Sequence, residues 1–262
     1  MARDRLSALS DEFLCSHILS KLSLKDAIRF SVLSRRWRCL WTLLPRLNFV
    51  LLKNTEIIDN ILFFHSAELE SLKILFCVSQ CEMSWKKWLM CTSLKRVKQI
   101  TLKIKPYMNV PPSLFSCDCL TVLKLVGFDL PRLPLNLCGF RDLRTCSLIL
   151  ITITSEILEK LITKCPLLEN LTVKECVGRI NFKISAANLK YLDFTGNYSA
   201  NSVTGNFPQL VNIRIDDCWE LRMELKSVGA LHLYTRDLEA LDGLSTTKSL
   251  TKILRWMGQV CM

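Results

Sequence analysis

The side chains best suited to chemistry in this chain are its thiols and imidazoles. The 262 residues include 13 cysteines and three histidines. No two cysteines form a C-x-x-C pair, and the nearest groupings, Cys117 with Cys119 and Cys77 with Cys81, have no partners at zinc-ligand spacing. The sequence therefore predicts no metal site.

Nucleophilic or cofactor chemistry has no better support. The histidines are scattered without an obvious Cys-His or Ser-His pairing, and no G-x-G-x-x-G or phosphate loop is present. Most cysteines adjoin aliphatic residues, as reduced thiols in a core do, which points to a reducing compartment. We therefore expect a binding protein of the cytosol or nucleus, with no catalytic residues and no cofactor.

The formal net charge of +11 fits several kinds of partner. Nucleic acid, an anionic membrane or an acidic protein could each be attracted, but the lysines are spread along the chain. The one basic and aromatic cluster, "SWKKWLM", is explained by core tryptophans with solvated lysines, so nucleic-acid binding is the less favoured alternative. The N-terminus has charges where a secretory signal would be apolar, and no run approaches 18 apolar residues, so we expect no membrane association.

Beyond residue 66 the pattern apolar-x-x-apolar-x-apolar recurs. The first members of successive copies are 28, 23, 23, 25, 21, 21 and 18 residues apart. Leucine-rich repeats run at about 20 to 29 residues, so all but the last offset fit. The matching triplets are Leu69-Leu72-Ile74, Val97-Ile100-Leu102, Leu120-Leu123-Leu125, Leu143-Cys146-Leu148, Leu168-Leu171-Val173, Leu189-Leu192-Phe194, Leu210-Ile213-Ile215 and Val228-Leu231-Leu233.

A polar residue follows three of these strands in register. Cys176, Asn197 and Cys218 are spaced 21 and 21, at the position where a side chain bonds the turn backbone in such repeats. An antiparallel sheet of similar period is the alternative. We predict an α/β solenoid with a curved parallel sheet on its concave face and helices and turns on its convex face, including a helix from Ser155 to Cys165 capped by Ser155.

The x positions of the strands should point from the concave face. We hypothesise that an acidic or phosphorylated segment of a protein substrate meets the basic early half, with Tyr191 or Tyr234 as an anchor. Ordinary solvated residues are the alternative. The candidate substrate-binding residues are Lys103, Lys124, Lys174, Tyr191, Asp193, Arg214, Asp216 and Tyr234.

Ahead of the repeats the sequence predicts a helical head, residues 1–46, with three short helices. Ser10, Ser23 and Ser34 are the expected N-caps, and Asp26 follows Ser23 as in a capping box. A linking strand or helix over 47–66, with a helix capped by Thr55, joins the head to repeats at 67–236.

The tail, 237–262, can form a helix capped by Thr246 or Thr247. Such a helix could close the last repeat, as solenoids need, or be the scar of a truncation.

The head resembles the F-box, in the version found in plant F-box/leucine-rich-repeat proteins of the F-box/FBD/LRR type. The resemblance lies in "LSDEFLCSHILSKLSLKDAIRFSVLSRRWRCLWTLLPRL", about 45 residues without gaps. The repeats are similar to the same family in "VPPSLFSCDCLTVLKL", "CPLLENLTVKEC" and "NFKISAANLKYLDFTGN". The family's FBD region has no counterpart in the sequence given.

The resemblance implies a substrate-recognition subunit of an SCF-type ubiquitin ligase. The F-box docks a Skp-type adaptor, and through it a cullin, while the repeats bind the substrate and perform no chemistry. The family usually has proline where Ser10 and Ser23 stand, which bears on adaptor affinity. A further alternative to this function is an F-box/leucine-rich-repeat scaffold that binds partners without assembling a ubiquitin ligase. The expected adaptor-facing residues are Leu9, Ser10, Phe13, Ile18, Leu19, Leu22, Leu24 and Trp37.

Overall fold

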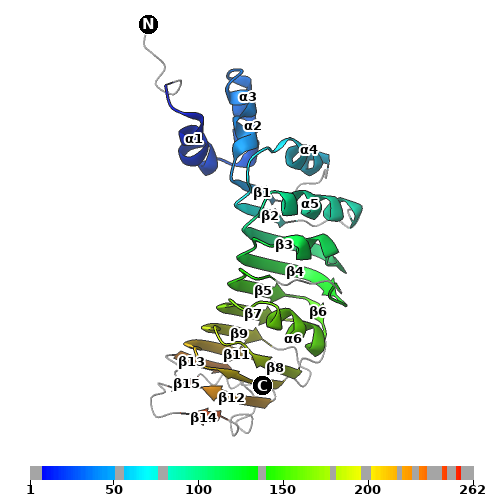
Figure 1. The fold of residues 1–262 in the computed structure, drawn as a ribbon, viewed down its shortest axis with the longest axis vertical. Helices are drawn as coiled ribbons and strands as arrows, with labels where there is room; N and C mark the ends of the chain where they lie inside the picture. Colours follow the sequence, from blue (N-terminus) through cyan, green and yellow to red (C-terminus); the bar gives the residue numbers. More distant parts are fainter. Residues whose placement is uncertain are drawn as a thin grey trace, which may run out of the picture.

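The protein is an elongated stack with a helical head at one end (Figure 1). The computed structural model describes residues 8–50, 56–75, 82–134, 140–177, 181–195, 202–216, 220–225, 230–234, 244–246 and 252–254. One continuous buried cluster runs from Leu14 in the head to Ile215 in the repeats. Head and repeats therefore share a core.

The head is built from short helical turns. Two predicted serine caps are confirmed, since the Phe13 and Asp26 amides donate to the hydroxyls of Ser10 and Ser23 at 3.2 Å. The third is not, because α3 has Arg36 as its N-cap residue, although the Trp37 amide donates to the Ser34 hydroxyl at 3.4 Å. The elements are α1 (Asp11–Phe13), η1 (Leu14–Ile18), η2 (Leu19–Lys21), α2 (Leu24–Arg29), η3 (Phe30–Val32), α3 (Trp37–Leu40) and η4 (Trp41–Leu43).

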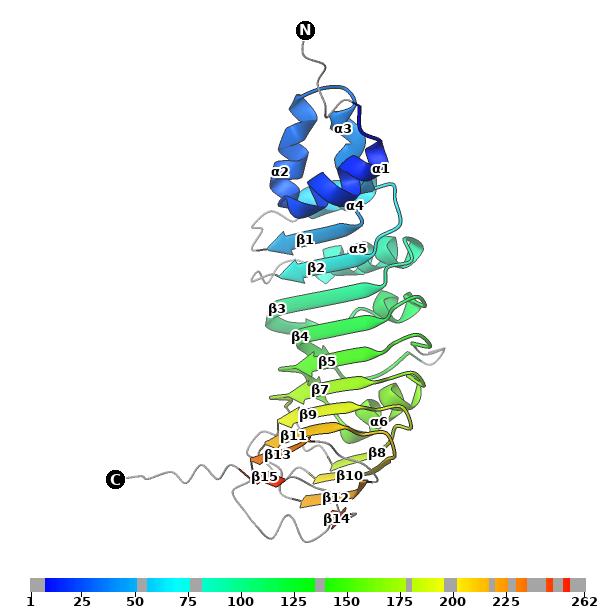
Figure 2. The same ribbon diagram turned by 90° about the vertical axis from the view of Figure 1, so that its left-hand side faces the viewer.

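The repeats form one main parallel sheet, with strands stacked like rungs in Figure 2. Its order is β1-β2-β3-β4-β5-β7-β9-β11-β13-β15, and the short β6 pairs with β4. The strands are β1 (Arg46–Val50), β2 (Ser71–Leu75), β3 (Gln99–Asn109), β4 (Val122–Leu130), β5 (Thr145–Ile149), β6 (Thr152–Ile153), β7 (Asn170–Lys174), β9 (Tyr191–Thr195), β11 (Asn212–Asp216), β13 (Ala230–Tyr234) and β15 (Lys252–Leu254).

The predicted triplets lie in register across this sheet. Leu72 pairs with Ile100, and the row continues through the middle members of the next triplets to Ile213. From Leu72 to Ile213 these residues are at most 2% exposed. The predicted parallel solenoid is therefore confirmed, and burial of this apolar row is what binds one repeat to the next.

The sheet begins earlier than expected. β1, within the predicted linking segment, pairs with β2 in parallel register, so this segment is already a repeat. The predicted helix of this segment is α4 (Glu56–Phe64), in which Ile58, Ile61 and Leu62 are buried and Ile57 is 43% exposed. The predicted cap Thr55 lies outside the described residues.

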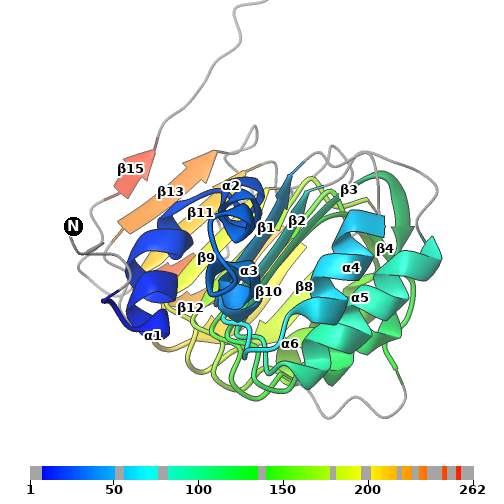
Figure 3. The same cartoon turned by 90° about the horizontal axis from the view of Figure 1, so that it is seen from above.

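The far side of the sheet changes with repeat length. The longer early repeats carry α5 (Glu82–Leu94), η5 (Pro112–Ser116) and α6 (Ser155–Thr163), and Figure 3 shows α4 and α5 together on one side of the sheet. The shorter later repeats return as strands of a second parallel sheet. These are β8 (Asn181–Ser185), β10 (Ser202–Phe207), β12 (Glu220–Leu225) and β14 (Leu244–Thr246).

Two local predictions on this side have different outcomes. Trp85 and Trp88 of α5 are core residues at 1% exposure, as predicted for "SWKKWLM". Helix α6 begins at Ser155 with Thr154 as its N-cap residue, so the prediction that Ser155 caps it is wrong by one position. Thr154 has the extended backbone of a cap but makes no capping hydrogen bond through its side chain.

The tail also differs from its prediction. Where it is described, residues 244–246 and 252–254 are strands, with β15 added to the main sheet beside β13 and β14 added to the second sheet beside β12. An unpaired sheet edge satisfies its backbone groups by adding a strand, and this outweighs the helical spacing of Leu250, Ile253 and Leu254.

The turns after the strands reuse one backbone geometry. The residue that follows the five register-paired positions of a strand has positive φ in three repeats. It is Gly127 after the first five residues of β4 (81°), Leu150 after β5 (53°) and Glu175 after β7 (51°). Cys176, one residue on, lies near the Lys174 carbonyl (3.5 Å) and the Leu148 carbonyl (3.8 Å), as predicted for the turn. Asn197 and Cys218 lie outside the described residues.

The described part of the chain contains neither a membrane-spanning helix nor a metal-binding cluster. No described helix combines the length and apolarity needed to cross a membrane. No group of three or more His, Cys, Asp or Glu among the described residues is placed to hold a metal ion.

Candidate functional site

On the concave face of the main sheet, residues of neighbouring strands line up in rows, and we call each row a lane. Strand register places one residue from each strand side by side, about 4.8 Å apart. The middle lane runs Asn48, Lys73, Thr101, Lys124, Ser147, Thr172, Asp193, Arg214 and His232. The last lane runs Val50, Leu75, Lys103, Val126, Ile149, Lys174, Thr195, Asp216 and Tyr234.

The early strands gather three lysines on this face. Lys73 of β2, Lys103 of β3 and Lys124 of β4 are all exposed, and none of the three forms an ion pair with a described residue. The described residues that face this side in the register shared by β1 to β5, from Arg46–Val50 to Thr145–Ile149, include no acidic residue. Lys103 and Lys124 were predicted; Lys73 was missed because the concave positions of its strand were not considered, although the same triplet pattern marks them.

Lys174 differs from the other predicted lysines. Its ammonium lies 2.6 Å from the Asp193 carboxylate, which pairs the two predicted residues with each other. Asp193 is 6% exposed, and its second oxygen, Oδ1, has no hydrogen-bond partner in the described part of the chain. Lys174 is therefore already paired within the protein, unlike Lys103 and Lys124, and its role in substrate binding stays a prediction.

The remaining predicted concave residues have mixed outcomes. Tyr191 is half-buried at the start of β9, and Arg214 of β11 is exposed. Asp216 and Tyr234 belong to β11 and β13, but their side chains lie outside the described part of the structure. The register keeps Tyr191 several strands away from the early lysines.

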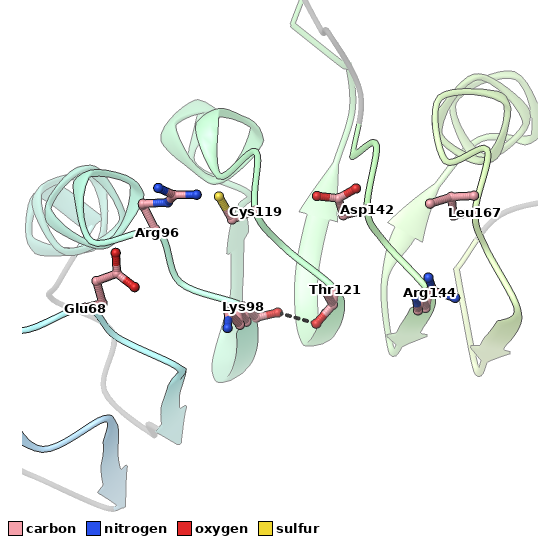
Figure 4. Close-up of a pocket in the computed structure, with 8 residues that line it drawn as sticks. All are labelled: Glu68, Arg96, Lys98, Cys119, Thr121, Asp142, Arg144 and Leu167. Carbon is pink, nitrogen blue, oxygen red and sulfur yellow. Dashed lines mark hydrogen bonds between the residues drawn. The ribbon is translucent and has the colours of Figure 1, made fainter.

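A second feature lies at the edge where the strands begin. A cavity of about 410 Å³ there is lined by acids and bases together, among them Glu68, Arg96, Lys98 and Asp142 (Figure 4). Thr121 donates to the Lys98 carbonyl across it at 3.0 Å, and Arg144 is engaged by Glu169. Because its charges alternate, this edge favours no single class of partner.

The head divides the predicted adaptor-facing residues into two groups. Leu19 and Trp37 are 1% and 8% exposed and belong to the head's own core, so we correct the expectation that they face a partner. Ser10 and Phe13 are exposed, with the Phe13 ring stacked on His17 at 4.3 Å. The partly buried residues packed against the core are Leu9, Ile18, Leu22 and Leu24.

The head also has exposed apolar residues that the sequence did not single out. Val32 and Leu33, at the end of η3, are 85% and 60% exposed. Their helical spacing matched a buried stripe, so the pattern could not separate them from core residues. An exposed apolar pair of this kind is typical of an interface.

An arginine from "SRRWRCLW" holds the head together. The Arg36 guanidinium lies 2.7 Å from the Asp11 carboxylate and also donates to the Leu9 carbonyl, which joins α3 to α1. Arg35 and Arg38 are exposed. Of the three arginines in this stretch, Arg35 and Arg38 are therefore accessible to a partner, whereas Arg36 is paired with Asp11.

The junction of head and repeats contains a buried histidine. His65 Nε2 donates to the Leu44 carbonyl at 2.8 Å, and the buried Nδ1 has no hydrogen-bond partner among the described residues. Desolvation lowers the pKa of His65, and the nearby Lys95 charge adds to this while the Leu44 carbonyl opposes it. The imidazole is therefore held neutral.

The buried thiols are poor nucleophiles. Burial raises the pKa of Cys117 and Cys165 to about 12 and that of Cys176 to about 11. Because the thiolate is the reactive form, these side chains serve the core.

Comparison with known proteins agrees with both halves of this architecture. A family model described as "FBD-associated F-box protein At5g56370, LRR repeats" matches residues 85–249, and the F-box domain model matches residues 6–49. No solved structure matches the chain.

Three relatives from Arabidopsis thaliana illustrate the likeness. The F-box/FBD/LRR-repeat protein At1g13570 is 33% identical over 76% of this chain and 50% of its own length. The F-box/FBD/LRR-repeat protein At5g56420 is 33% identical over 83% and 56%. The F-box/LRR-repeat protein At3g26922 is 31% identical over 81% and 75%. The chain thus spans about half the length of the first two relatives.

Proposed function

Because this chain belongs to the plant F-box/leucine-rich-repeat family, we propose that it is the substrate-recognition subunit of an SCF-type ubiquitin ligase. The observation that carries the proposal is the combination of a compact F-box head with an open, charged concave sheet on one shared core. In this function the chain performs no chemistry. It works in the cytosol or nucleus and holds a substrate lysine near the ubiquitin thioester, which raises the effective concentration of that lysine.

The head would dock a Skp-type adaptor, and through it a cullin. The exposed apolar side chains Phe13, Val32 and Leu33 offer the contact area, with the partly buried Leu9, Ile18, Leu22 and Leu24 beneath. Ser10 and Ser23 replace the prolines usual in the family, yet both cap their helices. The docking surface therefore keeps its shape.

The repeats would bind the protein substrate on the concave face. Lys103, Lys124 and Arg214 are exposed there, and Tyr191 is half-exposed. The substrate's chemistry is taken up below.

Co-expression with a Skp-type adaptor tests the proposal. We expect the wild-type chain to co-purify with the adaptor, and Val32→Asp with Leu33→Asp to lose it, since a charge would be buried in the interface. Met90→Asp with Leu94→Asp is the matched control, because these α5 residues are 63% and 80% exposed outside the head.

Failure of the wild-type chain to co-purify with any Skp-type adaptor would contradict the proposal. It would favour the alternative of a scaffold that binds partners without a ligase. Equal loss in the head variant and the α5 control would show that the Val32 and Leu33 surface is not the docking site.

A further inference from the structure

The three early lysines surround one point on the concave face. Parallel register places Lys73, Thr101 and Lys124 side by side on β2, β3 and β4, so the outer two are about 10 Å apart at their backbones. Lys103 lies two residues along β3 from Thr101, about 8 Å from each of the others. We name Lys73, Lys103 and Lys124 the lysine triad; its flexible stems can bring three ammonium groups over Thr101.

The charge of the triad is not balanced within the described structure. No described residue forms an ion pair with a triad lysine, and the described residues that face this side in the register shared by β1 to β5 include no acid. Three strands beyond β4 the sheet does supply a carboxylate, since Asp193 of β9 is paired with Lys174 of β7. The triad thus needs an anion from outside.

We infer that the lysine triad binds the phosphate of a phosphoserine or phosphothreonine in an extended segment of the protein substrate. The inference rests on the proposed function and names its substrate class. An exposed lysine–carboxylate pair contributes little. A phosphate carries close to two negative charges and three acceptor oxygens, so one group can bind all three ammonium groups at once.

The surroundings of the triad define the rest of the segment. Leu75, Val126 and Ile149 lie in the same lane as Lys103, on strands β2, β4 and β5. Leu75 and Ile149 are half-exposed, so they can contact an aliphatic side chain beside the phosphorylated residue. The preferred segment is therefore phosphorylated and flanked by aliphatic residues.

The same surface fits nucleic acid poorly. Single-stranded nucleic acid is bound by positive charge interleaved with aromatic side chains on which bases stack. The described residues that face this side in the register shared by β1 to β5, from Arg46–Val50 to Thr145–Ile149, include no aromatic residue, and Arg46, the one arginine among them, is paired with Glu70. A phosphopeptide needs no such stacking.

Binding of a peptide library tests the inference. The probe is a set of fluorescent peptides with a fixed central phosphoserine and randomised flanks, beside the same set with serine, titrated with the full chain both alone and in complex with its adaptor. We expect at least about tenfold tighter binding of the phosphorylated set, with enrichment of aliphatic flanks.

Matched variants locate the site. Lys73→Gln, Lys103→Gln and Lys124→Gln together should remove the preference for phosphate. The control variant carries Lys86→Gln, Lys160→Gln and Lys164→Gln, three exposed lysines of α5 and of the end of α6, and should keep the preference. Its charge change is the same, and thermal melting verifies that both variants fold.

Three results would overturn the inference. They are equal binding of the two peptide sets, equal loss in the triad and control variants, and tighter triad-dependent binding of a single-stranded RNA. None of these results tests adaptor docking, because the triad lysines lie on β2 to β4 and their substitution leaves the head unchanged. Loss of adaptor co-purification with retained phosphopeptide binding would instead contradict only the proposed function.

Discussion

Two parts of one concave face hold the same residue type in opposite electrostatic states. On β2 to β4, Lys73, Lys103 and Lys124 are exposed and without a described ion pair. On β7 and β9, Lys174 is bonded to Asp193, a carboxylate at 6% exposure. The early lysines thus stabilise the described structure through no ion pair and are available to a partner, whereas Lys174 balances the charge of Asp193. Four predictions test this contrast or what surrounds it.

The largest expected effect on stability comes from Lys174→Met. It leaves the Asp193 carboxylate largely buried without its counter-ion, and we expect a loss of about 2 kcal/mol in the free energy of unfolding. Lys124→Met, the matched change on the early face, should stay within about 0.5 kcal/mol of wild type. Urea denaturation of both variants measures the difference, and equal losses would remove the contrast.

The second prediction is that stability depends on pH through His65, which lies at the junction of the head and the early repeats. His65 has a lowered pKa when folded, so the unfolded chain binds its proton first as pH falls below 6.5. Stability is full above pH 6.5 and is lost as pH falls toward the lower folded-state pKa, by at most about 1.4 kcal/mol per pH unit.

His65→Gln serves as its control. Glutamine keeps a donor for the Leu44 carbonyl but cannot titrate. Denaturation midpoints of wild type and variant between pH 7 and pH 5 should converge as the pH falls. An unchanged gap would show that His65 does not set the acid sensitivity.

The smallest expected changes in stability come from substitutions at the turn position that follows β4 in the early region and β7 in the later one. Gly127→Ala, after the core of β4, should cost about 1 kcal/mol because φ is positive there. Glu175→Gly, after β7, relieves the same strain in a residue with a side chain and should be neutral or stabilising by up to about 1 kcal/mol. Thermal melting of the two variants decides, and shifts of the same sign would contradict this explanation.

The sheet could be predicted from the sequence because its cause is local. Leu72, Ile100, Leu123 and their successors repeat one apolar spacing, and burial of that row fixes the register. The serine caps were predictable for the same reason, since Ser10 and Ser23 act within one helical turn.

What could not be predicted depends on distant pairs. Lys174 and Asp193 are 19 residues apart and meet only because β7 and β9 are neighbours. Arg36 meets Asp11 from another helix, and the edge beside β13 turns the apolar tail into a strand. Val32 and Leu33 share the spacing of core residues, so their exposure follows from how the head packs.

Reconstituted ubiquitin transfer tests the central proposal most directly. The chain would be combined with a Skp-type adaptor, cullin, RING subunit and charged conjugating enzyme, and given a lysine-bearing substrate fused to the best phosphopeptide. We predict transfer that requires the chain and the phosphate and is lost both with the lysine triad replaced by glutamine and with Val32→Asp and Leu33→Asp. Transfer at the same rate without the chain would contradict a substrate-recognition function.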